Sequence, residues 1–204
     1  MQFHHFNNTG YWLSPVDKTL LEPVWDEVNS YQHLLPNPRP WGHKLHQDLT
    51  LCKDHLGKIV NAHLDAYLKT CPYNPLLQTE DLFGTVKPLY LRDCWVNFIT
   101  RGYYEPIHPH SGVVTFVLWL QVPYTREEET AFRPTVDHRY NTAGCFGIHT
   151  PNAKGRLEHT ILPSYNDWEG TICLFPAEMQ HSVFPFFSSE EVRIAVSGNL
   201  FYEQ

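Results

Sequence analysis

The sequence predicts a mainly β protein, with two N-terminal helices packed on an antiparallel β-sandwich or jelly roll. Two stretches in the first third carry apolar residues at helical spacing, whereas residues from Val86 onward form apolar runs of strand length bounded by turn residues. A chain of 204 residues is long enough for one domain with a proper core. We therefore expect residues 1–85 to be a helical extension packed on a β core that spans residues 86–204.

The first helix is expected to begin at Ser14. This hydroxyl cap is followed by Pro15 at the first helical position and by an acid three residues after the cap. The apolar stripe continues through residues 20–31, where Pro23 marks a kink or a restart. A second helix is expected over residues 50–69, since a proline-containing segment follows it.

Runs of apolar, aromatic and β-branched residues predict the strands of the core. The four main runs are residues 89–100, 113–122, 171–175 and 192–200. The intervening segment is polar and rich in loops, with two short strands expected near residues 145–149 and 157–162. A charge run at residues 125–129 is interpreted as a solvated loop.

Composition limits the classes of function. The formal charge of −7 argues against a general nucleic-acid or anionic-membrane binder, which needs a basic face. The five cysteines are scattered without a CxxC pair, so we expect free thiols in a reducing compartment. The N-terminus lacks the pattern of a signal peptide, and no apolar stretch has the length of a membrane helix. We expect a cytoplasmic protein.

Three histidines form a candidate metal site. His108 and His110 are two residues apart beside a predicted strand, so in an extended segment both imidazole rings point to the same face. His181 follows another predicted strand at its end. Three neutral imidazoles with open coordination positions are typical of a catalytic site for iron, zinc or another divalent ion.

Arg193 is a candidate anion-binding residue at the start of the last predicted strand. Its neighbours are apolar, and a buried guanidinium group needs an anionic partner. Its planar fork suits the bidentate binding of a carboxylate. An ion pair with Glu190 or Glu191 is the alternative.

These residues belong to a longer series of motifs. In chain order the motifs are Trp95-Val96-Asn97, Gly102, Tyr104, His108-x-His110, Val117-x-Trp119-Leu120-Gln121-Val122-Pro123, Gly170-Thr171-Ile172-x-x-Phe175-Pro176, His181-x-Val183-x-Pro185 and Arg193-Ile194-Ala195-Val196-Ser197-Gly198-Asn199. Over residues 89–201 the chain resembles the 2-oxoglutarate- and Fe(II)-dependent oxygenases of bacteria and phages. The first third matches this family only in its expected helices.

The resemblance implies a fold, cofactors and roles for residues. The fold would be a double-stranded β-helix, the cupin-like jelly roll. His108 and His181 would bind Fe(II), and Arg193 would bind the distal carboxylate of 2-oxoglutarate. The enzyme would use dioxygen and 2-oxoglutarate to hydroxylate an unidentified substrate, with release of succinate and carbon dioxide. Asn97 and Thr115 are candidates for hydrogen bonds to the cosubstrate.

The chain departs from the family pattern at two positions. The wider superfamily has HxD or HxE at the first motif, where this chain has His110 as the expected third ligand. Glu105, Asp137 or water are the alternatives. Many members have Arg-x-Ser, where this chain has Ala195, so Ser197 on the same strand face is expected to assist the arginine.

Two other functions stay open at this point. One is a cupin-like metalloprotein with three histidine ligands to zinc or iron that does not use 2-oxoglutarate. The other is a non-enzymatic jelly-roll binding module. The loops at residues 76–87 and 124–168 are expected to border the pocket, but they do not identify the substrate. The sequence leaves the oligomeric state open, with a homodimer as one alternative.

Overall fold

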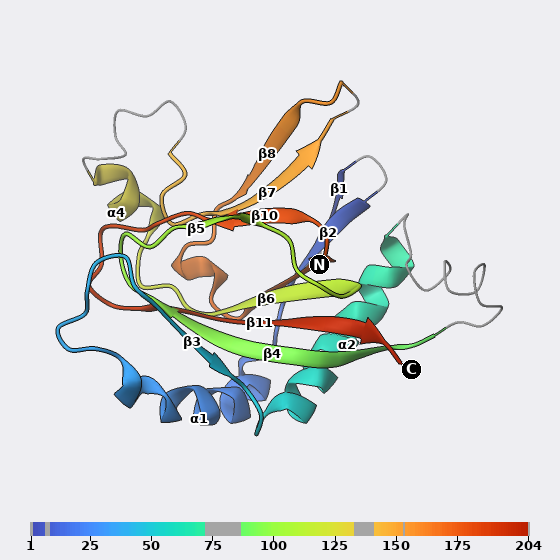
Figure 1. Cartoon of the computed structure of the whole chain (residues 1–204), viewed down its shortest axis with the longest axis horizontal. Coiled ribbons are helices and arrows are strands. Elements are labelled where there is room, and N and C mark those ends of the chain that lie inside the picture. Colours follow the sequence, from blue (N-terminus) through green and yellow to red (C-terminus); the bar gives the residue numbers. More distant parts are fainter. Residues whose placement is uncertain (1, 7–8, 72–86, 133–140, 153, 204) are drawn as a thin grey trace.

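The computed structural model describes residues 2–6, 9–71, 87–132, 141–152 and 154–203. Its described strands form two antiparallel sheets that face each other, which confirms the mainly β jelly-roll fold (Figure 1). The large sheet has the order β1-β2-β9-β6-β11-β4-β3, and the small sheet has the order β5-β10-β7-β8. The strand bounds are β1 Gln2–Phe6, β2 Thr9–Pro15, β3 Lys44–Asp48, β4 Leu89–Ile99, β5 Glu105–His108, β6 Val114–Gln121, β7 Phe146–Pro151, β8 Leu157–Leu162, β9 Thr171–Pro176, β10 Gln180–Val183 and β11 Arg193–Tyr202.

Helices α1 (Glu22–Ser30) and α2 (Lys53–Thr70) cover the outer face of the large sheet (Figure 1). The shorter helices are η1 (Lys18–Leu21), η2 (Gln32–Leu34), α4 (Arg126–Ala131) and η3 (Asn166–Trp168). Because side chains alternate along a strand, Val96 and Phe98 of β4 pack toward the helices, while Ile99 packs between the sheets. The large sheet is therefore buried on both faces, which explains the nearly continuous apolar sequence of β6.

A buried carboxylate joins the two long helices. Glu27 of α1 accepts hydrogen bonds from the backbone amides of Thr50, Leu51 and Cys52, at 2.8, 3.1 and 2.8 Å. Cys52 is the N-cap of α2 and offers no side-chain cap of its own. Glu27 therefore supplies the oxygen atoms that a capping residue provides in other helices.

The first 85 residues differ from the sequence expectation. They contain the two expected helices, but also strands β1, β2 and β3 of the large sheet, so this segment is not purely helical. The predicted helix start at Ser14 was wrong, because Ser14 pairs with Ile172 in the ladder between β2 and β9. The true N-cap is Asp17 of η1, and Pro23 lies in the first turn of α1, which makes it a restart.

The charge run after β6 also differs from its prediction as a solvated loop. Residues 126–131 form helix α4, whose first turn is fixed by a capping box between Thr125 and Glu128. Glu129 is buried and accepts hydrogen bonds from the backbone amides of Phe187 and Ser188. The helix thus anchors the segment between β10 and β11.

Other expectations agree with the structure. The predicted strands correspond to β4, β6, β7, β8, β9 and β11, each within a few residues of its expected bounds. All five cysteines are buried, and none of them forms a disulfide. None of the helices in the described ranges combines the length and the apolar character that a membrane span requires.

Candidate metal centre

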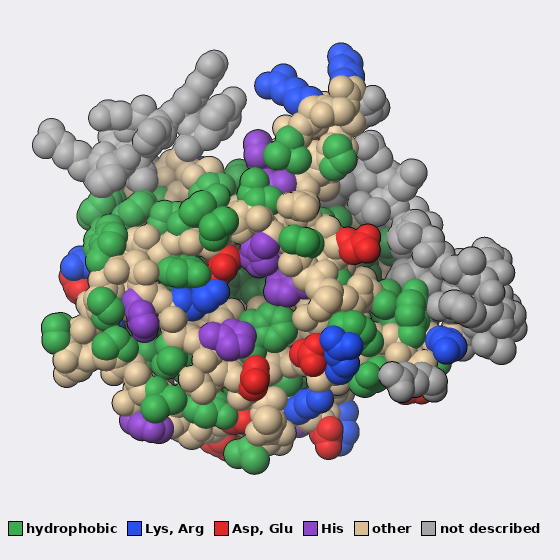
Figure 2. Space-filling view, in the orientation of Figure 1, with side chains coloured by type: hydrophobic (Ala, Val, Ile, Leu, Met, Phe, Trp, Pro, Cys, Tyr) green, Lys and Arg blue, Asp and Glu red, His purple; other side chains and the backbone are tan. Residues whose placement is uncertain are grey.

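A cavity of about 260 Å³ lies between the two sheets and opens to the surface. In the space-filling view, histidine side chains gather beside a hollow in this face of the molecule (Figure 2). Nine described positions that the sequence analysis discussed for the site line this cavity: Asn97, Glu105, His108, His110, Thr115, His181, Arg193, Ala195 and Ser197. Of the described residues in the segment 124–168, which was expected to border the pocket, Phe146 alone lines it.

His108 and His181 come from neighbouring strands of the small sheet. They are register partners in the ladder between β5 and β10, so their rings lie on the same face. The Nδ1 atom of His108 donates to the carbonyl of Pro106 at 2.7 Å, and that of His181 donates to the carbonyl of Met179 at 3.0 Å. A carbonyl only accepts, so in the neutral ring the proton is on Nδ1 and the Nε2 lone pair is free to bind a metal.

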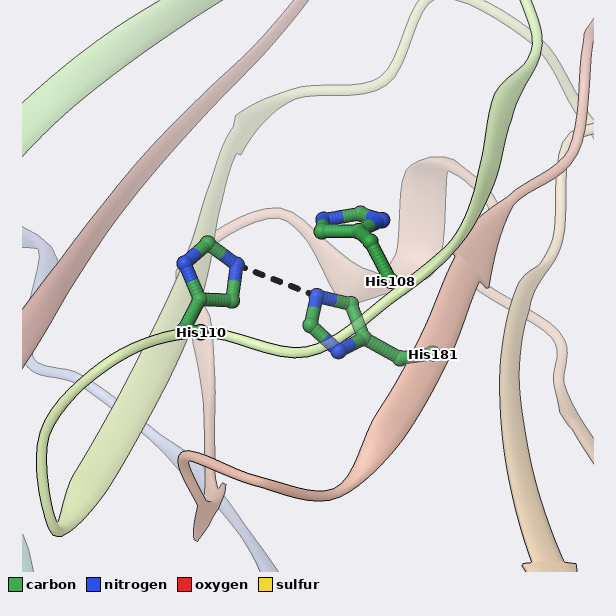
Figure 3. Close-up of side chains that lie close together, drawn as sticks. All are labelled: His108, His110 and His181. Atoms are coloured by element: carbon green, nitrogen blue, oxygen red, sulfur yellow. Dashed lines mark hydrogen bonds between the residues drawn. The ribbon is translucent and has the colours of Figure 1, made fainter.

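His110 completes the cluster from the loop that follows β5 (Figure 3). Its Nε2 atom is 3.2 Å from Nε2 of His181, and one ring nitrogen of each of the three histidines lies within 4.8 Å of the others. Two nitrogens that bind one ion at about 2.1 Å, near a right angle, lie roughly 3 Å apart. The three side chains therefore fit a divalent metal ion.

Burial keeps the imidazoles of His110 and His181 uncharged. Burial lowers the pKa of His181 to about 3. Burial likewise lowers the pKa of His110 to about 4. Metal ions bind neutral imidazole, so the cavity holds these two rings in the form that a ligand requires.

Aromatic rings hold the histidines in place. Trp95 of β4 stacks on His110 with ring centroids 5.4 Å apart, and Phe146 of β7 stacks on His181 at 5.4 Å. Phe175 of β9 meets His181 edge to face at 5.1 Å. The cluster is thus packed against both sheets. The sequence analysis gave Trp95 no role, because only the pairing of distant segments places it beside His110.

Arg193 lies in the same cavity and has no carboxylate partner in the described part of the chain. Its Nη1 atom donates to the hydroxyl of Tyr124 at 2.9 Å and to the carbonyls of Phe184 and Gly144 at 3.3 and 3.4 Å. Its Nη2 atom is buried without a hydrogen-bond partner among the described residues. A buried cation with a free donor fits an anionic ligand.

The alternative ion pairs of Arg193 do not form. Glu190 pairs with Arg101 at 2.5 Å, and Glu191 pairs with Arg39 at 2.7 Å, both at the surface. Tyr124 is a residue that the sequence analysis missed. It is buried, its hydroxyl donates to the carbonyl of Gly144 at 2.9 Å, and it thereby fixes the lone pair that accepts from Arg193.

The other polar candidates differ in what they can offer a ligand. The hydroxyl of Thr115 donates to the carbonyl of Gly198 at 3.0 Å, which leaves it only acceptor capacity. The Oδ1 atom of Asn97 is 3.0 Å from Nδ1 of His46, so its amide nitrogen is the group that can donate into the cavity. Ser197 lines the cavity on the same face of β11 as Arg193.

Glu105 and Asp137 were the two carboxylates considered as the third metal ligand, and the structure describes only Glu105. Glu105 lines the cavity, but its Oε2 atom accepts from the ammonium of Lys44 and from the hydroxyl of Tyr103. The candidate metal-binding cluster in the described ranges consists of the three histidines alone. Asp137 lies outside the described residues.

Three convergent histidines share one jelly-roll cavity with a buried arginine that has no carboxylate partner among the described residues. These are the features expected of a non-haem metalloenzyme with an anionic cosubstrate. A family model described as "Putative 2OG-Fe(II) oxygenase" matches residues 93–199, slightly more than half of the chain. The chain belongs to this family of oxygenases, whose cofactor is Fe(II) and whose cosubstrate is 2-oxoglutarate. Family membership decides against the non-enzymatic module and against an enzyme that does not use 2-oxoglutarate.

Solved structures support the same fold. A 2OG-Fe(II) oxygenase family oxidoreductase from Burkholderia pseudomallei is 16% identical, with 94% of this chain and 84% of that chain covered and a TM-score of 0.51. A Trichoplax adhaerens prolyl hydroxylase, solved with a peptide of the hypoxia inducible factor oxygen degradation domain, is 13% identical, with coverage of 96% and 84% and a TM-score of 0.54. The viral collagen prolyl hydroxylase of Paramecium Bursaria Chlorella virus-1, solved with 2OG, is 10% identical, with coverage of 95% and 96% and a TM-score of 0.53. A search of curated proteins finds no significant match.

Proposed function

We propose that this oxygenase hydroxylates its substrate with Fe(II) held by His108, His110 and His181 and with 2-oxoglutarate held by Arg193. The observation that carries the proposal is the free Nη2 donor of Arg193, buried in the cavity that the three histidines line. A dicarboxylate that binds the metal through one end and the guanidinium through the other satisfies this donor.

The overall reaction balances without a further reductant. Dioxygen and 2-oxoglutarate are consumed, one oxygen atom enters a substrate C–H bond as a hydroxyl group, and the other enters succinate. The carboxylate next to the keto group leaves as carbon dioxide. The iron supplies the activation of dioxygen, which no side chain can provide.

The side chains of the cavity bind and orient 2-oxoglutarate, and they exclude water. Arg193 is fixed by Tyr124 and by two backbone carbonyls, so its fork does not need to reorganise when the carboxylate arrives. Ser197 and the amide nitrogen of Asn97 are the proposed additional donors to the cosubstrate. Thr115 also lines the cavity, but its hydroxyl donates to Gly198 and 2-oxoglutarate carries only acceptors, so we assign it no bond to the cosubstrate in this arrangement. Trp119 is part of the apolar wall that keeps water from this end of the cavity.

We also propose a division of labour along the chain. Residues 86–204 carry the proposed iron and 2-oxoglutarate ligands and form the catalytic core. The described part of residues 1–85 supplies helices α1 and α2, which cover the large sheet, and strands β1, β2 and β3, which belong to it.

The test is an anaerobic titration of the Fe(II)-loaded protein with 2-oxoglutarate, followed by the weak visible absorption band of the chelate. The wild type is expected to show the band at near-stoichiometric binding. Arg193→Ala is expected to bind 2-oxoglutarate roughly tenfold or more weakly, a loss of about 1.4 kcal/mol. Lys44→Met is the matched control, because it removes the other cation of the cavity and is expected to leave this affinity unchanged.

A thermal melt of each variant separates loss of binding from loss of the fold. Arg193→Lys is a second variant that keeps the charge but not the fork, and it is expected to bind more weakly than the wild type. Bound iron without the band in the wild type, or an unchanged affinity in a folded Arg193→Ala, would contradict the proposal.

A further inference from the structure

Besides Arg193, the cavity is lined by a pair of charged side chains of opposite sign. Lys44 of β3 and Glu105 of β5 form an ion pair, and their side chains are only 26% and 23% exposed. Figure 2 shows Lys or Arg and Asp or Glu side chains close to the hollow that the histidines border. Burying such a pair is expensive, and apolar residues of the same size often stabilise a protein equally well. The charges therefore need an explanation other than stability.

The contacts of the pair leave binding capacity on both partners. The hydrogen bonds to Glu105 from Lys44 and Tyr103 both end on Oε2, and Oε1 has no hydrogen-bond partner among the described residues. The ammonium group of Lys44 donates one of its three protons to Glu105 and also interacts with Tyr103, which leaves at least one proton. A free carboxylate oxygen and an ammonium group with remaining donor capacity thus lie side by side at the cavity.

Both groups stay charged. Burial alone would lower the pKa of Lys44, but the hydrogen bond and the charge of Glu105 raise it above its ordinary value. Burial would raise the pKa of Glu105, but the contacts with Lys44 and Tyr103 lower it below its ordinary value. The pair offers a fixed cation and a fixed anion at neutral pH.

The position of the pair matches a substrate better than the cosubstrate. Across the large sheet, Lys44 pairs with Ile99, and Ile99 pairs with Arg193, so a strand separates the two cations. Glu105 lies on the strand that also carries His108, three residues along. The ion pair is therefore on the β3 and β5 side of the cavity, while Arg193 is on the β11 side.

We propose that Lys44 and Glu105 bind the α-carboxylate and the α-ammonium group of a free amino acid, whose side chain points toward the three histidines. This inference rests on the proposed function, because it assigns the substrate of the same site. The lining of the same cavity contains Trp95, Ile99 and Val183, which suits an aliphatic side chain. A cavity of about 260 Å³ is below the usual range of roughly 300–1,000 Å³ for ligand sites, which favours a small substrate.

The first experiment supplies single free L-amino acids to the protein with Fe(II), 2-oxoglutarate and dioxygen, and measures succinate. At least one aliphatic amino acid is expected to raise the rate about tenfold over the background without substrate, as two charge-assisted contacts allow. Its N-acetyl derivative, its amide and a peptide that contains it are expected to have no effect. A calorimetric titration under argon measures the same discrimination as binding, independent of turnover.

Two variants then test which residue binds the carboxylate of the substrate and which binds its ammonium group. Lys44→Met is expected to bind the amino acid and its decarboxylated amine equally, because the partner of the carboxylate is gone. Glu105→Gln is expected to bind the amino acid and its 2-hydroxy acid analogue equally. Both variants are expected to raise KM for the amino acid about tenfold and to keep the wild-type affinity for 2-oxoglutarate. Glu191→Gln, which removes a carboxylate from the surface pair with Arg39, is the control and is expected to behave like the wild type.

The outcomes separate the two proposals. No chelate band with 2-oxoglutarate would overturn the proposed function and, with it, the substrate assignment. A normal band combined with no response to any free amino acid would overturn the substrate assignment alone. An equal response to free and blocked amino acids, or unchanged discrimination in both variants, would do the same.

Discussion

The indole ring of Trp95 lies on the imidazole ring of His110, with 5.4 Å between the ring centroids and 27° between the planes. His110 is the member of the cluster that comes from a loop, so it lacks the strand backbone that fixes His108 and His181. Its position depends on this stack and on the hydrogen bond from its backbone amide to the carbonyl of Ala177 at 2.8 Å.

Trp95→Ala is therefore expected to weaken Fe(II) binding about tenfold, in the range that supporting partners of metal ligands have. Trp95→Phe keeps an aromatic face. Its loss of Fe(II)-binding free energy is expected to be less than about a third of the loss in Trp95→Ala. Competition with a chromophoric chelator under argon measures both affinities. Equal affinities for wild type and Trp95→Ala would show that the stack does not position His110.

The third ligand is tested at His110 itself. His110→Ala is expected to reduce the affinity for Fe(II) roughly a hundredfold or more, since even the partners of ligands are worth 10- to 100-fold. His110→Asp is expected to retain iron, because a carboxylate at this position gives the more common two-histidine, one-carboxylate site. Iron content after gel filtration measures the result. Exposed His159 of β8 provides the control, as His159→Ala removes an imidazole outside the cluster. Full iron content in His110→Ala would assign the third position to another group.

Alternation along strands explains why much of the site could be predicted from the sequence. Arg193, Ala195 and Ser197 follow each other at every second position of β11, and a period of two places such residues on one face. The same spacing predicted His110 beside His108, although His110 lies in the loop just after β5. The structure brings all of them to one cavity, while their roles as ligands stay predictions. The strands of the core were predictable for the same reason, since their apolar runs are long and bounded by turns.

The missed features depend on pairing between distant segments. Strand β3, Lys44–Asp48, lies at the edge of the large sheet and has a polar sequence with no buried residue, so it lacks the pattern of a strand. Its contact with β4 brings Lys44 to the cavity, and only the fold places Glu105 beside it. Helix α4 is different, because its capping box was present in the sequence, but the charge run around it favoured a loop.

Gly198 of β11 is expected to be required for the strand that carries Arg193 and Ser197. A Cβ atom at this position would lie 2.6 Å from the backbone oxygen of Asp93 and 2.7 Å from Cε1 of Phe116. Backbone cannot move aside as a flexible side chain does, so Gly198→Ala should lower the free energy of unfolding by about 1–3 kcal/mol. Urea unfolding followed by circular dichroism measures this change.

Gly57 of helix α2 gives the matched control for that substitution. A Cβ atom added at Gly57 would have Leu91 Cβ as its nearest neighbour, at 3.9 Å, which is an ordinary van der Waals contact. Gly57→Ala is expected to keep or raise stability by up to about 1 kcal/mol, because alanine is the better helix former. A Gly198→Ala protein as stable as the wild type would show that β11 can shift without loss.

Glu27 should make the stability of the protein depend on pH in the acid range. Burial tends to raise the pKa of this carboxyl group, but the three backbone amides of residues 50–52 lower it to about 2. Because the folded-state pKa is below the unfolded value, the stabilisation is complete above about pH 4.5 and is lost as the pH falls toward 2. The difference between the two pKa values corresponds to about 3 kcal/mol. Glu27→Gln is expected to lower the free energy of unfolding at pH 7 by a similar amount and to flatten its change between pH 4.5 and 2.

Asp26→Asn, at an exposed position of the same helix, is the control and is expected to retain the wild-type dependence of stability on pH. Urea unfolding across this pH range is the measurement, and a wild-type slope in Glu27→Gln would assign the acid sensitivity to other carboxylates.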